Sequence, residues 1–391
     1  MKRRHVEGDA ASDLKKRKAT DSEITKMTVA PISQFSTSPC PVYKQPVELG
    51  CFSLDIDRAF HSDRRGLRTY CAPDVRLRLH LSAGYDGYVE KEGTEYLDHI
   101  LTWITYNLSS LQSRHSILLS NERLPFDFIT WRGQFTKIMC TPYERRDPWR
   151  IGLSLWNGTI YMTELETEHS RQQKLTQTER QKLMCYWGRK FEDYCTEERS
   201  SLEVRNPVNN MEAFCSVVST SLDDYRILMA GEVDCMRKEC DKKPPENYIE
   251  LKTSRKIEGH RQGSSFRRFK LLRWWCQSYL LGVPEIIAGF RDDDGILQHL
   301  TTYRTLELPN LVKSERNVWS GSLCLTFTKK LLSWIQTVVT KENVVYVMDW
   351  ESPFTHVTME ETQEDKFVFL RQWYIKNLES NDQVGQRQAH Q

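Results

Sequence analysis

Two short apolar segments of the chain carry charged residues at alternate positions. Glu232 and Asp234 flank a valine in the first segment, and Glu250 and Lys252 flank a leucine in the second. Side chains alternate between the two faces of a β-strand, so each pair would project from one face while the apolar residue between them enters the core. If the two strands pair, the fold gathers three carboxylates and one ammonium group on a half-buried surface.

Such a surface constrains the chemistry as well as the fold. Clustered carboxylates repel one another, and at least one would be driven neutral unless a cation lay between them. A hard divalent cation with oxygen ligands, Mg²⁺ or Mn²⁺, would relieve the repulsion. An Asp followed further along by Glu-x-Lys resembles the motif of the PD-(D/E)xK nucleases, in which metal activates a water and the lysine stabilises charge. Glu-x-Lys also occurs on solvated edge strands. Gly231, just upstream of Glu232, nevertheless favours a site, because it would leave room for a ligand beside the backbone.

Composition excludes other classes of protein. The 391 residues are 39% hydrophobic, which is enough for a sizeable core, and a formal charge of +2 provides no global field that would attract nucleic acid or a membrane. The longest apolar stretches fall short of the roughly 18 to 20 residues that a membrane span needs, so we expect no membrane partner. A basic N-terminus without an apolar segment behind it is not a typical secretory signal, so we expect an intracellular protein.

The cysteines and histidines argue against a zinc site. The 11 cysteines contain no CxxC pair, and none of the 10 histidines has HxxxH spacing or lies near a cysteine pair. Scattered cysteines in a large chain are typical of reduced thiols in the cytosol or nucleus. Any metal ligands are therefore expected to be carboxylates.

The two ends of the chain are expected to be tails. Residues 1–28 are polar, with basic clusters at 2–4 and 15–18. Their spacing is typical of a bipartite nuclear localisation signal, the alternative being a solvated basic tail that touches RNA non-specifically. Residues 379–391 form a second polar tail. Because no linker or internal repeat interrupts the chain between the tails, we expect 29–378 to be a single catalytic domain.

Local patterns alternate between strand and helix. Strands are expected over 126–140, 151–164, 226–235, 248–253, 285–291 and 344–350, and helices over 178–197, 264–280 and 320–340. Asn157-Gly158 is the strongest two-residue hairpin signal, and we expect 126–140 and 151–164 to be neighbouring antiparallel strands. Strands with interspersed helices predict an α/β or α+β fold with a mixed sheet.

Further charged residues could join the carboxylates. Glu192 lies one turn after Gly188 on one helix face, although this spacing alone favours an ordinary exposed glutamate. Arg132, between a tryptophan and a glycine in an expected strand, suits a phosphate clamp as well as it suits a surface ion pair. Lys270 and Gln277 share one face of a later helix, and either could face solvent.

Taken together, these residues resemble the DXO family of decapping exoribonucleases over about 30–377. Four motifs occur in the family's order: Trp-Arg-Gly at 131–133, Gly-x-x-x-Glu at 188–192, Glu-x-Asp at 232–234 and Glu-x-Lys at 250–252. The flanks at 213–217 and 288–291 are also similar. The resemblance implies two mixed β-sheets flanked by helices, with a PD-(D/E)xK-like active site in a pocket between them.

The resemblance also implies roles for single residues. Metal would be held by Glu192, Asp234, Glu250 and the main-chain carbonyl of Leu251, with Glu232 adjoining it through water or a second ion. Lys252 and Gln277 would contact the scissile phosphate and the nucleophilic water. The catalytic set is then Glu232, Asp234, Glu250, Lys252 and Gln277.

Substrate contacts are implied for a further group. Arg132, with Trp131 and Gly133, would hold the RNA backbone. Arg58, Glu95 and Cys215, in looser matching segments, would add contacts, as would Glu232, Lys252 and Gln277. The loops 196–210 and 236–247 carry no motif.

The activity implied is that of a nuclear, Mg²⁺- or Mn²⁺-dependent RNA 5'-end hydrolase with one or two ions. It would remove triphosphates, incomplete or unmethylated caps and NAD caps, and then degrade the 5'-monophosphate RNA in the 5' to 3' direction. One alternative is a DNA nuclease with the same core. Another is a non-catalytic nuclear partner that stimulates a separate exoribonuclease, and an interaction with such an exoribonuclease could also accompany catalysis.

Overall fold

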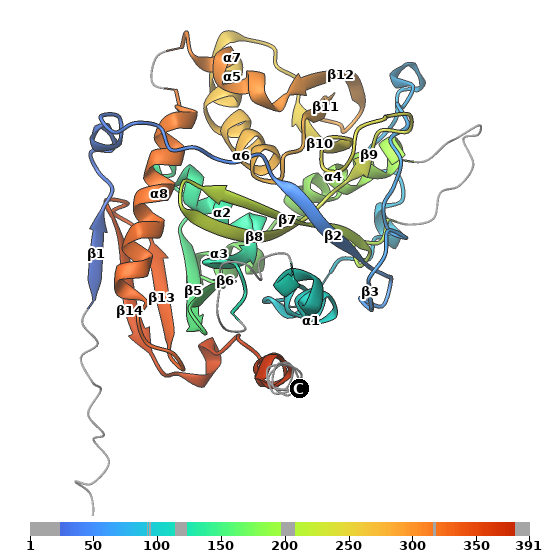
Figure 1. The fold of residues 1–391 in the computed structure, drawn as a ribbon. Helices are drawn as coiled ribbons and strands as arrows, with labels where there is room; N and C mark the ends of the chain where they lie inside the picture. Colours follow the sequence, from blue (N-terminus) through green and yellow to red (C-terminus); the bar gives the residue numbers. More distant parts are fainter. Residues whose placement is uncertain are drawn as a thin grey trace, which may run out of the picture.

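The computed structural model describes residues 24–91, 93, 95–113, 123–196, 208–315 and 318–379. The basic clusters at 2–4 and 15–18, most of the loop 196–210 and nearly all of the C-terminal tail lie outside these ranges. Within them the chain forms a ten-stranded and a four-stranded β-sheet with helices around both (Figure 1). The expected fold class, two mixed sheets flanked by helices, is confirmed.

The large sheet is mixed because β4 runs parallel to both of its neighbours. The other pairs in it are antiparallel, including the β5–β6 hairpin that turns at Asn157-Gly158. Its strands, in spatial order, are β1 (Thr25–Thr28), β14 (His356–Thr362), β13 (Val345–Trp350), β5 (Trp149–Trp156), β6 (Thr159–Leu165), β4 (Phe128–Trp131), β8 (Tyr225–Glu232), β7 (Ala213–Leu222), β2 (Val47–Leu54) and β3 (Phe60–His61).

The small sheet has the order β12 (Leu297–Arg304), β11 (Glu285–Arg291), β10 (Tyr248–Arg255) and β9 (Cys235–Met236). β10 is parallel to β11, whereas β9 pairs with β10 only at positions 248 and 249. From Glu250 onward, the edge of β10 that faces away from β11 is therefore left without a strand partner in the described part of the chain. This open edge positions the candidate site.

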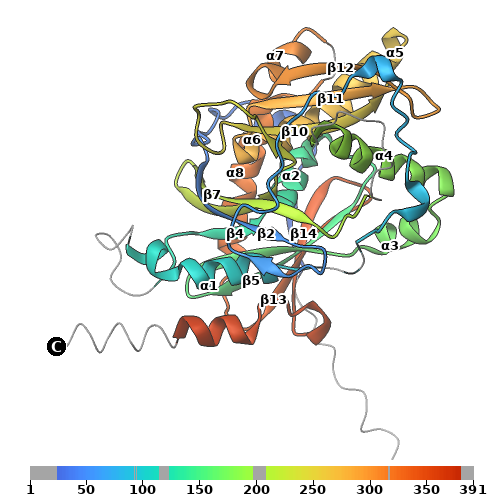
Figure 2. The ribbon, with the colours of Figure 1, turned by 90° about the vertical axis from the view of Figure 1, so that its right-hand side faces the viewer.

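Helices separate and cover the two sheets (Figure 2). One face of the large sheet packs against α1 (Asp98–Ser113) and a C-terminal helix over 372–379. Its other face packs against α2 (Arg132–Cys140), α6 (Leu271–Leu281) and α8 (Gly321–Val338), and α6 also covers the inner face of the small sheet. α4 (Glu179–Thr196) covers the outer face of the small sheet. The shorter helices are α3 (Glu168–Leu175), α5 (His260–Ser265) and α7 (Leu308–Val312).

Most of the expected elements are present, including the helices α4, α6 and α8 and the strands β8, β10, β11 and β13. The expectation of one strand over 126–140 was wrong. β4 ends at Trp131, and the next residues form α2, in which the buried Phe135, Ile138 and Met139 recur with helical spacing. Nor is this segment antiparallel to its neighbour, because β4 and β6 run in parallel.

Two boundaries also differ from the sequence-based expectation. The strand expected over 226–235 ends at Glu232, and Cys235 already belongs to the small sheet. Residues 25–28, assigned to the N-terminal tail, form the edge strand β1 against β14. None of the helices in the described ranges is both long and apolar enough to cross a bilayer. All eleven cysteines are free.

Candidate active site

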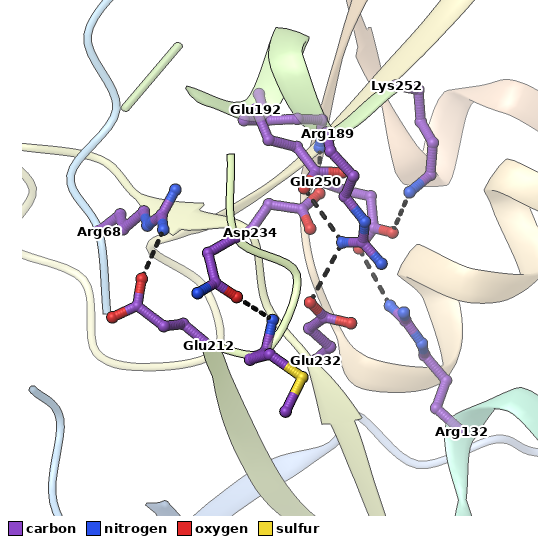
Figure 3. Close-up of polar contacts among 12 residues, drawn as sticks. Arg68, Arg132, Arg189, Glu192, Glu212, Glu232, Asp234, Glu250 and Lys252 are labelled. Carbon is purple, nitrogen blue, oxygen red and sulfur yellow. Dashed lines mark hydrogen bonds and ion pairs between the residues drawn. The ribbon is translucent and has the colours of Figure 1, made fainter. Parts of the chain in front are cut away.

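The acidic residues meet where β8 of the large sheet ends beside the open edge of β10 (Figure 3). Glu232 is the last residue of β8, and Asp234 lies between β8 and β9. The expectation that both residues share one face of a single strand was therefore wrong. The pairing of the two strands, on which the predicted cluster was conditional, does not occur, because β8 and β10 belong to different sheets. The chain brings them together by leaving one sheet at Glu232 and entering the other at Cys235.

Asp234 is bound to the open edge of β10. Its Oδ2 atom accepts a hydrogen bond of 2.6 Å from the main-chain N–H of Leu251. Because the N–H and C=O groups of one strand residue point to the same side, the Leu251 carbonyl also lies on this open edge. The carbonyl, for which the family resemblance implies a role as metal ligand, is therefore not used by a neighbouring strand.

Glu250 is held between two cations. Its side chain is 2% exposed, and its oxygens lie 3.0 Å from Arg132 Nη1 and 2.5 Å from Lys252 Nζ. Burial raises the pKa of this carboxyl, but Arg132 and Lys252 more than offset it and lower the pKa to about 2. Glu250 and Lys252 lie on the same face of β10, as strand alternation predicted.

Arg189 lies between Glu192 and Glu232. Its Nη1 atom is 3.1 Å from an oxygen of Glu192 and 3.3 Å from an oxygen of Glu232. Glu192 is therefore not the ordinary exposed glutamate that its spacing favoured. No role had been assigned to Arg189, because an arginine three residues before a glutamate is common on solvated helix faces.

Two of the carboxylates have raised pKa values. Burial raises the pKa of Asp234, and the nearby Glu250 raises it further. Burial also raises the pKa of Glu192, against the opposing effect of Arg189. A cation bound beside these two carboxylates would stabilise their charged forms, so both observations fit a site that binds an additional cation.

The donor set suits a hard divalent ion. Glu192, Glu232, Asp234, Glu250 and the Leu251 carbonyl offer only oxygen atoms. Over the described residues, no three His, Cys, Asp or Glu side chains already stand together as metal ligands. The ligand atoms therefore fit a divalent metal. The side chains, however, bind partners within the protein: Arg189 lies between Glu192 and Glu232, and Asp234 accepts a hydrogen bond from the Leu251 N–H.

Two glycines near the acidic residues have different surroundings. A Cβ atom on Gly188 would meet only Thr253 Oγ1 at 4.0 Å, so space remains between α4 and β10. A Cβ atom on Gly231 would lie 2.6 Å from Leu281 Cδ1 and 3.1 Å from Arg132 Cβ. The expected room for a ligand beside Gly231 is therefore taken by protein, and this glycine instead lets α2 and α6 approach β8.

Arg132 begins α2 rather than lying in a strand. Trp131 supplies no side-chain cap to this helix, and a Cβ atom on Gly133 would meet no atom within 4 Å. The first N–H groups of α2 therefore have no side-chain cap and lie near the open space beside Gly133, which suits a phosphate. Gln277 is half-buried in α6, one turn before the Leu281 that contacts Gly231.

A cavity of about 410 Å³ adjoins the acidic residues and is called the Arg58 cavity below. It is lined by five of the predicted residues: Arg58, Glu95, Trp131, Cys215 and Glu232. Lys91, Gln134, Lys174 and Arg189 also line it. The sequence analysis gave none of these four a role: Arg189 occupies a variable position of the 188–192 motif, Gln134 follows the 131–133 motif, and Lys91 and Lys174 lie outside the motifs.

Inside this cavity Arg58 and Glu95 bind each other. Arg58 Nε donates to Glu95 Oε1 at 2.8 Å, and Lys91 Nζ donates to Glu95 Oε2 at 2.6 Å. Burial raises the pKa of Glu95, but hydrogen bonds with His99, Arg58 and Lys91 outweigh it and lower the pKa well below the usual range. Cys215 lies opposite Glu232 in the β7–β8 register, and burial followed by the charge of Glu232 raises the pKa of its thiol.

Known proteins are similar to this chain in sequence and in fold. Residues 44–375 match the family model described as RAI1 like PD-(D/E)XK nuclease. The Decapping and exoribonuclease protein of Xenopus laevis is 41% identical over 355 residues, which cover 86% of this chain and 87% of that protein. The protein of the same name from Homo sapiens is 37% identical over 353 residues, covering 88% of this chain and 87% of the relative.

Two solved structures of Rai1 proteins have a similar fold. Candida albicans Rai1 in complex with pU5-Mn2+ matches with a TM-score of 0.75 and 26% identity, covering 91% of this chain and 99% of that one. S. pombe Rai1 in complex with 3'-FADP matches with a TM-score of 0.69 and 26% identity, covering 87% of this chain and 100% of that one.

Proposed function

Because the chain belongs to the RAI1-like PD-(D/E)XK nuclease family, we propose that it is a divalent-metal-dependent hydrolase of RNA 5' ends. It removes incomplete or unmethylated caps, NAD caps and 5'-triphosphates, and then degrades the 5'-monophosphate RNA in the 5' to 3' direction. The observation that carries this proposal is the position of Glu250, buried between Arg132 and Lys252 and beside Asp234 and the Leu251 main chain.

The relatives support the chemistry. Two similar proteins are named for decapping and exoribonuclease activity, one similar structure contains pU5 and Mn2+, and another contains 3'-FADP. A flavin nucleotide shares its adenosine and its diphosphate with an NAD cap. The site of this chain has the carboxylates, the lysine and the cavity that the same chemistry as in these relatives would require.

The metal would be held by Glu192, Asp234, Glu250 and the Leu251 carbonyl, with Glu232 adjoining. When bound, a divalent ion supplies Lewis acidity that lowers the pKa of a water and neutralises phosphate charge. We assign this role to Mg²⁺ or Mn²⁺, as one ion or two, because the ligands are all oxygen atoms.

The side chains around the acidic residues have separate tasks in this mechanism. The Arg132 guanidinium and the first N–H groups of α2 bind the phosphate and hold it in one orientation. The Lys252 ammonium stabilises the charge that develops on the phosphate oxygens, and Gln277 orients the attacking water. Each has this task whichever leaving group the phosphate carries, so one site serves caps, triphosphates and phosphodiesters.

The Arg58 cavity receives the 5' end. Arg58 and Lys91 provide cations for terminal phosphates, Trp131 offers an aromatic surface, and Glu95 fixes the two cations in place. Cys215 contributes a neutral, buried wall. How a given 5' end fits among these groups determines how well it is cleaved.

The proposal includes the location of the protein in the nucleus, a protein partner and the extent of the catalytic domain. The basic clusters at 2–4 and 15–18 support nuclear import, and a nuclear exoribonuclease is a proposed partner that would consume the product. We assign the catalytic activity to one domain over 29–378, extended by the strand β1 that begins at Thr25.

A time course on end-labelled RNAs tests the function. RNAs with a triphosphate, an unmethylated cap, an NAD cap or a monophosphate are incubated with Mg²⁺ or Mn²⁺, with and without EDTA. Release of the 5' moiety followed by degradation, in the presence of metal alone, supports the proposal. Cleavage of DNA of the same sequence at an equal rate would instead support a DNA nuclease, because an RNA enzyme can read the 2'-OH.

A further inference from the structure

A second cavity lies beyond Lys252 and is called the basic groove below. Its volume is about 560 Å³, and its lining includes six cationic side chains and no Asp or Glu: Arg146, Arg255, Lys256, Arg261, Lys270 and Arg273. The net charge of the whole chain is only +2. The positive charge of the groove is therefore a local feature.

The groove continues the face of β10 that carries the acidic site. Glu250, Lys252 and Ser254 alternate along the strand and so share one face. Ser254 lines the groove and accepts a hydrogen bond of 3.1 Å from Lys270 Nζ. Because a strand rises by about 3.3 Å per residue, the groove begins roughly 7 Å beyond Lys252.

The groove and the Arg58 cavity adjoin different ends of the acidic site. Glu232, at the end of β8, lines the Arg58 cavity. Ser254, two residues after Lys252, lines the groove. An RNA with its 5' end in the Arg58 cavity and its scissile phosphate beside Glu250 therefore extends its 3' part toward the groove.

Half of the cations in the groove have no carboxylate partner among the residues that the structure describes. Arg255 pairs with Asp293 and Lys256 with Glu258, while Arg273 pairs with Glu144 and Asp147. Arg146, Arg261 and Lys270 form no ion pair with any carboxylate of the described residues. A concave surface with three uncompensated cations matches the repeating negative charge of a nucleic-acid backbone.

One side of the groove is formed by an irregular helical turn. A π-helical turn, Phe266–Lys270, interrupts the helix between α5 and α6, and such turns are frequent at functional sites. Phe269 and Lys270, both from this turn, line the groove. The Arg146 guanidinium lies 4.5 Å from the centre of the Phe269 ring, which holds a planar cation at the groove surface. Planar guanidinium and aromatic groups are surfaces on which unpaired bases stack.

We propose that the basic groove binds the single-stranded RNA on the 3' side of the scissile phosphate, without reading its sequence. This inference rests on the proposed RNA 5'-end activity and adds the path by which the body of the substrate leaves the site. An RNA that reaches the groove binds more tightly than one that ends at the acidic residues.

Single-turnover cleavage of two 5'-monophosphate RNAs tests the groove. One RNA has about three nucleotides and the other about twelve, lengths below and within the range of single-strand site sizes. The wild-type chain is compared with Arg146→Ala/Arg261→Ala and with the control Arg304→Ala/Lys341→Ala, whose cations are 73% and 65% exposed and lie outside the groove lining. All four side chains are exposed, so we expect both variants to fold. The Tm of each variant checks this.

For the wild-type chain and the control, we expect half-saturation with the longer RNA at a concentration about tenfold lower than with the shorter RNA, as two or three phosphate contacts would give. The groove variant loses most of this tenfold advantage. The slope of log affinity against log salt for the longer RNA also falls by about 1.4 in magnitude, since each single-strand phosphate contact contributes about 0.7.

An unchanged length advantage and salt slope in the groove variant would overturn the inference, as would a wild-type chain that shows no length advantage. Cleavage of neither RNA by the wild-type chain would instead overturn the proposed function, and with it the inference built on it.

Discussion

The Oδ2 atom of Asp234 accepts a hydrogen bond from the main-chain N–H of Leu251 at 2.6 Å, which joins the segment leaving the large sheet to the open edge of the small one. This bond exists because β9 ends before it can pair with β10 beyond Ile249. Because β9 is short, the edge of β10 beyond Ile249 faces the site and is not paired with another strand of the described chain. The acidic residues lie at the junction of the two sheets for this reason.

Gly231→Ala tests how tightly the site is packed. Its Cβ atom would lie 2.6 Å from Leu281 Cδ1 and 3.1 Å from Arg132 Cβ, so the variant is expected to lose about 1–3 kcal/mol of unfolding free energy through overpacking. Arg132 would also shift, so cleavage should slow beyond the loss of stability. Urea denaturation and cleavage rates at a temperature where the variant is folded measure the two effects.

Gly133→Ala is the matched comparison. Its Cβ atom meets nothing within 4 Å and the position is helical, so stability should rise by up to about 1 kcal/mol. If the space beside α2 receives the RNA backbone, the KM of this stable variant should increase. A Gly133→Ala enzyme with an unchanged KM would contradict the assignment of this helix terminus to the substrate.

Arg189→Gln should strengthen metal binding. The side chain forms ion pairs of 3.1 and 3.3 Å with Glu192 and Glu232, and a metal must compete with it for both carboxylates. Loss of two partly exposed pairs corresponds to about 1 kcal/mol, or roughly a fivefold lower Kd for Mn²⁺. Calorimetric titration of Mn²⁺ without RNA gives the value.

Lys182→Gln is the control for this measurement. It removes another cation of α4, one that pairs with Glu179 near the start of the helix. Equal effects of the two variants on the Mn²⁺ Kd would show that the change reflects overall charge and not competition at the site.

Glu95→Gln should destabilise the protein in a pH-dependent manner. The pKa of Glu95 is lowered in the folded chain, so its charged form contributes stability above its unfolded pKa of about 4.3, and this contribution is lost as the pH falls further toward the folded pKa. At pH 7 the variant should lose about 1–3 kcal/mol, because Arg58 and Lys91 lose a charged partner. The difference in Tm should shrink progressively below about pH 4.3.

The exposed Glu168→Gln provides the baseline for this pH series. A Tm difference for Glu95→Gln that stays constant, or grows, as the solution becomes more acidic would contradict the proposed ion pairing.

Strand alternation was sufficient to predict that Glu250 and Lys252 share a face, because β10 is regular over its whole length. The same rule failed for Glu232 and Asp234, since the alternation of residue types continues across a point where the chain changes sheets. Arg132 was placed in a strand because β4 and α2 follow one another without a glycine or proline between them. The helical spacing of Phe135, Ile138 and Met139 was the available signal.

The partners of the site could not be read from local patterns. Arg189 of α4 acquires its role from Glu232, which ends β8 in the large sheet, and Lys91 and Lys174 reach the Arg58 cavity from distant segments. Such relationships depend on tertiary packing, which no spacing of residue types encodes. The motif residues could be named from the sequence because the members of each motif lie within five consecutive positions, although two of the motifs cross the end of a strand.

The central claim is that one carboxylate site performs every 5'-end reaction, and Asp234→Ala tests it most directly. The variant and the wild-type chain are compared on RNAs with a triphosphate, an unmethylated cap, an NAD cap and a monophosphate, with Tm as the check on folding. The account predicts that all four activities fall together, by about 10³-fold or more, in a protein that stays folded. Wild-type activity of the folded variant on any one of these RNAs would show a second site and contradict the account.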